Sequence, residues 1–596
     1  MTETSISTRW GGNGRVEETS SRSLESASIG SVSHSYDFDA IVVGSGITGG
    51  WAAKELTERG LKVLMLERGR SVVHRADYTT EHIPPWKIPN RDLPDRSLYE
   101  SDYPVQRRAR GFDYTTLRFW NNDRQNPYVQ ETNKPYNWFR ADVVGGKSLM
   151  WGRHSYRWSD LDFDANRRDG HGSDWPIRYA DVKDWYSYVE RFIGISGQSE
   201  GLPQLPDGEF LPPMELNVVE KAFKAAVEKQ FPERRVTIGR VANLTVPLRD
   251  RAACHYCGPC QRGCSVGAYF CTQSSTLPAA TATGLLTLRP NSVVESLEFD
   301  PASKRVAAVR VIDADNKTRH RYRTRIVFLC ASTFASVQIL LNSRSADFPL
   351  GLGNSSGTLG RFVMDHCHGG GAVATMPGFR RKYYYGNRPN TLYVPRFRNL
   401  QAAGEAAVDF VRGYGYQGIG YPAEWESTWQ KIPGFGADFK RKLREPGDWR
   451  LFLLGFGECL PYRDNRVVLD EKLDRFGIPQ LRFDITYREN ERRLSADMTE
   501  QAAAMLEAAG GQSIERFEKP FTPGTSIHEF GGARMGADPR ESVLSAYNQS
   551  HDVPNLFVTD GSCMVSTACV NPSLTFMALT ARAAKYAVEQ AGTHAI

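Results

Sequence analysis

Long apolar runs are absent from this 596-residue chain: none reaches the roughly 18 residues that a membrane-spanning helix needs, and Leu451–Phe456 is at most a buried strand. The N-terminus has neither the apolar core of a signal peptide nor a twin-arginine pair. The net charge of +6 is small for this length and comes without a long basic run, which argues against a nucleic-acid partner. We therefore expect a chain that neither spans a membrane nor binds nucleic acid.

Internal repeats are also absent, and the composition is that of an ordinary globular protein, with 40% hydrophobic and 24% charged residues. The length is sufficient for two or three domains with large cores. Residues 1–35 are rich in Ser, Thr, Gly and Glu and show no apolar periodicity. We expect them to form a flexible N-terminal tail, because they cannot bury enough surface to fold.

A nucleotide-binding pattern runs from Asp39 to Glu67. Ile41–Val43 is typical of a buried parallel strand, Trp51–Arg59 of a helix and Lys62–Leu66 of a second strand. Three glycines stand between the first strand and the helix in G-x-G-x-x-G order: Gly44, Gly46 and Gly49. Glu67 ends the second strand about 20 residues later, where a carboxylate can accept hydrogen bonds from an adenosine ribose. Because all these parts agree, the segment predicts dinucleotide binding rather than a structural glycine turn.

Each glycine has a separate task in such a unit. Gly44 makes the tight turn, Gly46 lets the backbone approach a pyrophosphate, and Gly49 lets the helix press on the strand. The N-terminus of the helix adds a positive field for the phosphates. Flavin and nicotinamide dinucleotides share this unit, so it leaves the choice between them open.

Two further segments are expected to reach the cofactor. Asp142–Gly152 contains paired glycines beside small residues, which suits a backbone that passes close to a flat ligand, although an ordinary glycine loop is the alternative. The contacts expected there are Gly145, Gly146 and Ser148. Thr287–Val294 reads as one strand that returns to the nucleotide-binding unit, with Val294 as a cofactor contact.

Half of the ten cysteines lie in one loop, residues 251–275. Four of them follow a C-x2-C-x2-C-x3-C spacing: Cys254, Cys257, Cys260 and Cys264. Cys271 comes shortly after them. The spacing favours a ferredoxin-like iron-sulfur cluster, although Ser265 stands where a proline is expected. Zinc sites usually have two CxxC pairs that lie farther apart, and cysteines spaced this closely rarely meet the geometry of a disulfide bond. Both interpretations nevertheless stay open.

The C-terminal region supplies another group of candidates. Asn555–Ser562 predicts an apolar strand that ends at Asp560 and Gly561, where a cofactor's ribityl chain or pyrophosphate can be held. Asn571 suits the cap of the next helix and Pro572 its first turn. The positive end of that helix would then face the same site and stabilise an anionic reduced flavin.

His528 precedes a Gly-Gly turn. A histidine by itself is more often structural, but the amide of Asn571 stands in the next turn that is expected to face the cofactor. We therefore interpret His528 and Asn571 as the catalytic residues.

These motifs together resemble the glucose-methanol-choline (GMC) oxidoreductase family. The resemblance is carried by the GxGxxG unit with Glu67, the Val144-Gly-Gly loop, the H-x-x-G segment at His528 and Asn571-Pro-Ser-Leu-Thr. It implies an α/β fold, with a Rossmann-like FAD-binding domain and an α+β substrate domain built on a β-sheet. We expect the FAD-binding domain at residues 36–370, including the cysteine loop, and at 516–596, and the substrate domain at 371–515.

The resemblance also implies a bound FAD, His528 as the general base and Asn571 as the group that hydrogen-bonds the substrate oxygen. In the related pyranose oxidases a histidine of the Gly-Gly loop bonds covalently to the flavin. Met150 stands at the aligned position, so we expect a noncovalent FAD. The cysteine loop further resembles that of bacterial flavin-dependent glucose and glucoside 3-dehydrogenases, whose catalytic subunits carry an iron-sulfur cluster. A 3Fe-4S or 4Fe-4S cluster is therefore expected on the four spaced cysteines.

The function implied by these resemblances is a dehydrogenase that oxidises a secondary hydroxyl of a sugar or glycoside, at position 3 by family analogy, to a ketone. Electrons would pass through the cluster to an external acceptor such as a cytochrome c. An oxidase that produces hydrogen peroxide and a redox-silent lyase are the alternatives. We expect export to the periplasm together with a small signal-bearing subunit, or else a cytoplasmic location.

Overall fold

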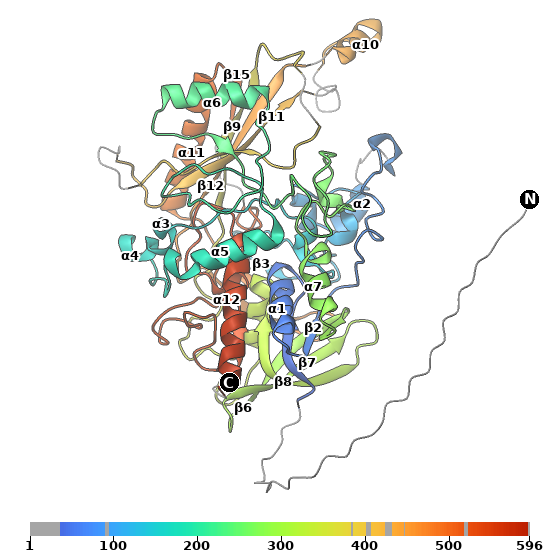
Figure 1. The fold of residues 1–596 in the computed structure, drawn as a ribbon, viewed down its shortest axis with the longest axis vertical. Helices are drawn as coiled ribbons and strands as arrows, with labels where there is room; N and C mark the ends of the chain where they lie inside the picture. Colours follow the sequence, from blue (N-terminus) through green and yellow to red (C-terminus); the bar gives the residue numbers. More distant parts are fainter. Residues whose placement is uncertain are drawn as a thin grey trace, which may run out of the picture. The chain divides into compact units, whose positions relative to one another are not determined.

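A largely parallel sheet of seven strands holds the nucleotide-binding unit in the computed structural model of the chain (Figure 1). The structure describes residues 36–89, 95–382, 386–400, 407–423, 432–445, 447–517, 522–593 and 596, and the expected tail, 1–35, lies outside them. The strand order is β5-β2-β1-β8-β7-β6, with β16 paired to β8. The strands are β1 (Phe38–Val43), β2 (Val63–Leu66), β5 (Leu286–Arg289), β6 (Ser292–Asp300), β7 (Arg305–Asp313), β8 (Arg319–Leu329) and β16 (Leu556–Val558).

Four neighbouring strands of this sheet end at the same edge. β1 pairs in parallel with β2 and β8, and β8 pairs in parallel with β16. Val43, the last residue of β1, lies opposite Leu66 of β2 and Leu329 of β8. The segments that follow these strands therefore meet at one edge, where open α/β sheets bind their ligands.

Helices cover this sheet because small residues let them approach closely. α1 (Ile47–Glu58) carries Gly49 and Gly50 on its buried side and contacts α7 (Thr276–Ala282) and α12 (Ser573–Gly592). A Cβ atom on Gly50 would lie 2.4 Å from the hydroxyl of Thr276 in α7. The other α-helices in the described part of the chain are α2 (Arg96–Asp102), α3 (Asp160–Phe163), α4 (Ala165–Asp169), α5 (Tyr179–Ile193), α6 (Val218–Gln230), α8 (Thr333–Asn342), α10 (Gly436–Arg444) and α11 (Glu489–Ala508).

A second sheet of six strands has the order β15-β9-β12-β11-β10-β4. Its strands are β4 (Thr237–Ile238), β9 (Cys367–Met376), β10 (Leu392–Val394), β11 (Tyr414–Pro422), β12 (Trp449–Gly457) and β15 (Gln512–Phe517). α11 lies across β9 and β12 and buries Leu494, Met498, Ala502 and Met505, a helical spacing that faces the sheet. Figure 1 shows this sheet and α11 beyond the parallel sheet along the long axis.

A third sheet joins distant parts of the chain. β13 (Arg466–Leu473) and β14 (Pro479–Asp484) form a hairpin, and β14 pairs with β3 (Val129–Gln130). This hairpin contacts α8 of the nucleotide-binding unit, although it comes from the segment between the strands of the second sheet.

Two local predictions were wrong. The single strand expected over Thr287–Val294 is divided: β5 ends at Arg289 and β6 begins at Ser292, because Asn291 adopts a left-handed backbone with φ of 52° and turns the chain. The helix expected from Trp51 begins at Ile47, directly after the glycine turn. The glycines there give no apolar period, and tertiary contacts with α7 and α12 order that first turn.

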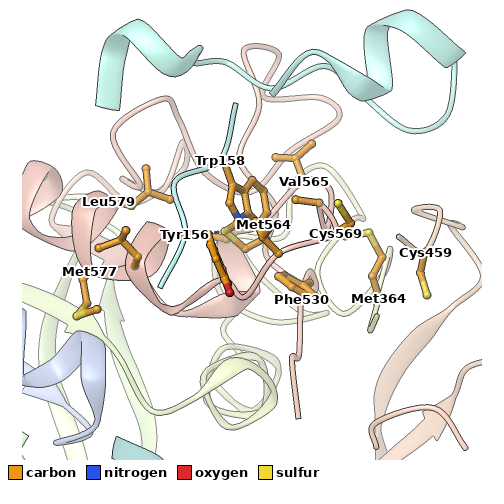
Figure 2. Close-up of a cluster of buried hydrophobic side chains, with 14 of the residues drawn as sticks. Tyr156, Trp158, Met364, Cys459, Phe530, Met564, Val565, Cys569, Met577 and Leu579 are labelled. Carbon is orange, nitrogen blue, oxygen red and sulfur yellow. Dashed lines mark hydrogen bonds between the residues drawn. The ribbon is translucent and has the colours of Figure 1, made fainter. Parts of the chain in front are cut away.

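One buried cluster anchors the loops that carry the candidate catalytic residues (Figure 2). Met364, Phe530 and Cys569 belong to it, each two residues from His366, His528 and Asn571 respectively. Met364 and Phe530 exchange two backbone hydrogen bonds of 2.9 and 3.1 Å. The positions of the two histidines are therefore fixed by the core. Within the described ranges, no helix combines the length and apolarity needed to cross a bilayer.

Candidate active site

A cavity of about 410 Å3 lies at the carboxyl edge of the parallel sheet. Its wall includes Gly44 after β1, Glu67 after β2, Cys330 after β8 and Asp560 after β16. The same cavity is also lined by His528, Asn571 and the second-sheet residues Gln417 and Phe456. One site is thus built from both ends of the chain.

The glycine turn fits the close approach of a dinucleotide. A Cβ atom on Gly44 would lie 2.4 Å from the carbonyl oxygen of Cys330, and one on Gly49 would lie 1.9 Å from that of Gly44. A Cβ on Gly46, by contrast, would meet nothing within 4 Å, and Gly46 lines the cavity. Gly49 itself is not part of the cavity wall, so its contribution is helix-to-strand contact.

Glu67 is held by the residue between the first two glycines. Its Oε2 accepts hydrogen bonds from Ser45 N at 3.1 Å and Ser45 Oγ at 2.6 Å, and its Oε1 accepts one from Gly69 N at 2.8 Å. Burial raises the pKa of Glu67 to about 7. Ser45 was not singled out in the sequence, because the x position of GxGxxG carries no signal of its own.

The Gly-Gly loop lies directly against this turn. Gly145 donates its N–H to Ser45 Oγ at 2.9 Å, and a Cβ on Gly146 would lie 3.4 Å from the Cα of Gly46. Gly146 and Ser148 line the cavity, whereas Gly145 does not. Ser148 donates to the carbonyl of Gly145 at 2.6 Å and so closes the turn. The two glycine segments form one narrow cradle, which suits a flat or extended ligand.

The remaining expected cofactor contacts, Val294, Asp560, Gly561 and Pro572, all line the cavity. Asp560 Oδ1 accepts hydrogen bonds from Ser562 N and Oγ at 3.1 and 2.6 Å, and burial raises the pKa of Asp560 to about 6. The predicted cap of α12 was wrong: the helix begins at Ser573 with Pro572 at the N-cap position, and Asn571 lies outside it. The Asn571 side chain is engaged with other side chains instead.

The two predicted catalytic side chains lie together. His528 Nε2 and Asn571 Nδ2 are 3.2 Å apart, and both residues line the cavity. Two partners complete the group: His528 Nδ1 lies 2.7 Å from His366 Nδ1, and Gln417 donates from Nε2 to Asn571 Oδ1 at 2.6 Å. His366 directly precedes β9 and Gln417 lies in β11, both strands of the second sheet. No spacing or motif in the sequence indicates a role for either residue.

The charge environment keeps His528 neutral. Burial lowers its pKa well below the usual value, and the nearby His366, His368, Lys147 and His154 add to this effect. Lys147 lies in the Gly-Gly loop, and its Nζ is 2.9 Å from Oε1 of Glu529, the residue after His528. This ion pair joins the two segments and balances the carboxylate of Glu529, which is only 2% exposed at its side chain.

The cysteine loop lies behind the same cavity wall. Cys260 and Cys271 are buried, Cys254 and Cys264 are half-buried, and Cys257 is exposed. Tyr269 donates its hydroxyl to the carbonyl of Leu149 at 2.6 Å, and Trp151 donates its indole N–H to the carbonyl of Phe270 at 2.8 Å. Within the described residues, no three His, Cys, Asp or Glu side chains converge as a set of metal ligands.

Comparisons with known proteins agree on one family for this chain. Residues 38–368 and 461–580 match the N- and C-terminal models of the GMC oxidoreductases. The chain is 28% identical to the 2-methyl-1,2-propanediol dehydrogenase of Mycolicibacterium austroafricanum, over 92% of this chain and 94% of the relative. It is 27% identical to the fructose dehydrogenase large subunit of Gluconobacter japonicus, over 92% of this chain and 97% of the relative.

A solved structure agrees in fold. The pyridoxine 4-oxidase from Mesorbium loti superposes with a TM-score of 0.56 and 18% identity, over 92% of this chain and 99% of that chain. The α/β fold and the family expected from the motifs are thereby confirmed. The protein belongs to the GMC oxidoreductase family, whose enzymes typically bind FAD and act on CH–OH donors.

Proposed function

We propose that this protein is an FAD-dependent dehydrogenase that oxidises a secondary hydroxyl of a sugar or glycoside to a ketone. The observation that carries the proposal is the pairing of His528 with Asn571 at 3.2 Å in the cavity that the glycine cradle and Glu67 also line. A base and an amide donor in the wall of the cavity that the glycine cradle also lines suit removal of a proton from an alcohol. Relatives named for a diol and for fructose favour polyol or sugar substrates.

The residues of the chain would divide the chemistry between them. His528 Nε2 takes the hydroxyl proton, and its neutral state at ordinary pH leaves the lone pair available. The Asn571 amide, which donates an N–H to His528 in this structure, would also hydrogen-bond the substrate oxygen as negative charge develops there. FAD bound in the cavity would supply the hydride acceptor. Met150 lines the cavity at the aligned attachment position, so the FAD would be held noncovalently.

The cysteine loop would provide the exit for electrons. We propose that Cys254, Cys257, Cys260 and Cys264 hold a 3Fe-4S or 4Fe-4S cluster that passes electrons to an acceptor such as a cytochrome c. Two buried guanidinium groups, one beside the loop and one at its start, support a negatively charged centre. Arg153 and Arg251 are 4% and 6% exposed, and their hydrogen bonds among the described residues go to backbone carbonyls. A buried cation without a carboxylate is costly, and thiolates would offset it.

The first test is an anaerobic panel of glycosides, free sugars and polyols, mixed with the FAD-loaded protein while the flavin absorbance is followed. A glycoside is expected to bleach the flavin, and NMR of the product is expected to place the ketone at position 3. The His528→Ala variant should bind FAD but fail to be reduced. Near-normal reduction of that variant, or bleaching by none of the alcohols, would remove the basis of the proposal.

The electron route has a separate test. Iron and acid-labile sulfide in anaerobically purified protein would support the cluster, and zinc alone would overturn it. Stoichiometric hydrogen peroxide during turnover would instead indicate an oxidase. We further propose export to the periplasm with a small signal-bearing subunit, which copurification from native cells tests.

A further inference from the structure

The hydrogen atoms of the His366–His528 pair can be placed from the partners of His366. Its Nε2 lies 3.2 Å from the carbonyl oxygen of Thr567 and 3.0 Å from that of Ala568. Carbonyl oxygens only accept hydrogen bonds, so this nitrogen carries the hydrogen. His366 is fully buried, and burial lowers its pKa to about 4, so the ring is neutral. Its other nitrogen, Nδ1, must therefore be an acceptor.

His528 is then the donor in the contact between the rings. The two Nδ1 atoms are 2.7 Å apart, and only one hydrogen fits between them. That hydrogen belongs to His528 Nδ1. The Nε2 of a neutral His528 consequently has no hydrogen and presents a lone pair.

The opposite side of His528 agrees with this assignment. Gln417 donates from Nε2 to Asn571 Oδ1 at 2.6 Å, which leaves the Asn571 amide N–H groups directed at His528 Nε2, 3.2 Å away. An amide N–H donates, so Nε2 must accept. The donors therefore run in one consistent direction at both ring nitrogens.

We propose that His366 is a positioning residue that holds His528 in the Nδ1–H tautomer, with the Nε2 lone pair facing the cavity. This inference rests on the proposed function of His528 as the base. In the other tautomer a hydrogen on Nε2 would oppose the Asn571 N–H, and the ring could not accept the substrate proton. The tautomer of a catalytic histidine is commonly fixed by the partner of its second nitrogen.

A neutral imidazole and a carboxylate can both fix the tautomer of His528, but they affect its pKa differently. A carboxylate beside Nδ1 would favour the imidazolium form and raise the pKa of the base. His366 supplies the acceptor without adding negative charge, and His368, Lys147 and His154 also lower the pKa of His528, while the neighbouring Glu529 carboxylate is paired with Lys147. The base therefore stays unprotonated to lower pH than a carboxylate-linked histidine would.

The backbone around both rings is fixed as well. Tyr487 donates its hydroxyl to the carbonyl of His366 at 2.9 Å. His528 donates its backbone N–H to Ser526 Oγ at 3.1 Å, and Ser526 in turn donates to Asp365, the neighbour of His366. The backbone of each histidine is thus anchored apart from the contact between the rings. His366→Asn and His366→Leu both lose the Nε2 hydrogen bonds to Thr567 and Ala568, so the two variants differ in the acceptor offered to His528.

The test compares His366→Asn with His366→Leu. The Asn amide oxygen can replace Nδ1 as the acceptor, whereas Leu offers none. A His368→Asn variant is the matched control, because His368 is a buried histidine of β9 that hydrogen-bonds a carbonyl, Gly455 O at 3.1 Å.

The first readout is 15N NMR of the histidine-labelled, FAD-loaded protein without substrate, with the His528 signals assigned by their loss in His528→Ala. The wild type, His366→Asn and the control are expected to show a protonated Nδ1 and an unprotonated Nε2. The Leu variant is expected to lose that preference. A wild-type His528 protonated on Nε2 would overturn the proposal, as would an unchanged tautomer in a folded Leu variant.

The second readout is the rate of flavin reduction with pH. The Leu variant is expected to be slower by about 10- to 100-fold, the cost that is typical of removing the hydrogen-bond partner of a metal-binding histidine, with KM little changed. Asn should restore most of the rate, and equal loss in both variants would refute the tautomer role. If the NMR result is as expected but no alcohol reduces the flavin, the proposed function fails while the assignment of His366 stands.

Discussion

Binding of FAD is expected to release a proton from Glu67 and therefore to weaken as the pH falls. Burial raises the pKa of the Glu67 carboxyl from 4.5 to about 7, even though it accepts hydrogen bonds from Ser45 and Gly69. A ribose hydroxyl is a further donor, and donors favour the ionised carboxylate. The bound nucleotide therefore lowers the pKa of Glu67 again.

The size and sign of the effect follow from this shift. If the pKa of Glu67 returns to its ordinary value in the complex, the full change in the free energy of FAD binding with pH is about 3 kcal/mol. The free protein takes up a proton below pH 7 that the complex does not hold. The affinity for FAD is therefore highest above pH 7, where Glu67 of the free protein is already ionised, and it falls as the pH is lowered. FAD should bind about tenfold more weakly at pH 6 than at pH 8.

The assay is a titration of FAD-depleted protein with FAD at constant ionic strength, followed by flavin fluorescence at several pH values. The control is Glu67→Gln, which should bind more weakly at pH 8 and lose the pH dependence that Glu67 causes. A smaller slope near pH 6 would remain from Asp560, whose pKa burial raises to about 6. Constant wild-type affinity from pH 6 to 8, or an identical slope in the Gln variant, would refute the reasoning.

Three further outcomes follow from individual contacts. Gly49→Ala places a Cβ 1.9 Å from the carbonyl oxygen of Gly44, so it should lower the free energy of unfolding, measured in urea, by about 3 kcal/mol. Gly46→Ala places its Cβ in open space, so it should weaken FAD binding and leave the stability unchanged. Lys147→Met removes the ion-pair partner of the buried Glu529 carboxylate and should lower the free energy of unfolding by about 3 to 5 kcal/mol. The double variant Lys147→Met/Glu529→Gln should recover stability, because it has no buried carboxylate at position 529. Gln417→Leu frees the Asn571 amide and should slow flavin reduction about tenfold at unchanged FAD affinity, and an unchanged rate would count against this orientation.

The sequence predicted those parts of the fold whose signal is local. The apolar pattern of the sequence predicts strands at 305–313 and 319–329 and a helix over 489–509. β7 and β8 have the bounds of these strands, and α11 ends one residue before the end of the predicted helix. These segments have a clear apolar period, which depends only on neighbours in the chain. His528 and Asn571 could be selected for a similar reason, because each stands beside a recognisable turn.

The missed residues act through contacts between distant segments. His366 is 162 positions from His528, and Gln417 is 154 positions from Asn571. Each comes from a segment with an ordinary strand pattern, where a single polar residue is no signal. The cap assigned to Asn571 failed for a related reason: the local pattern of Asn before Pro is typical of a helix start, but Gln417 and His528 engage the side chain instead.

Three contacts hold the parts of the site together, and each of them joins segments at least 100 residues apart in the chain. Ser45 accepts from Gly145, Lys147 pairs with Glu529, and His366 accepts from His528. Because the C-terminal strand β16 also pairs with β8, the cavity wall and the base can be complete only when the last part of the chain has joined the sheet. Such long-range closure is slow to form, but it couples the site to the core, because the isolated bridge between the buried residues Met364 and Phe530 also places the two histidines. Loss of that bridge would thus disturb the base and the fold together, whereas loss of the His366 acceptor alone would disturb only the base.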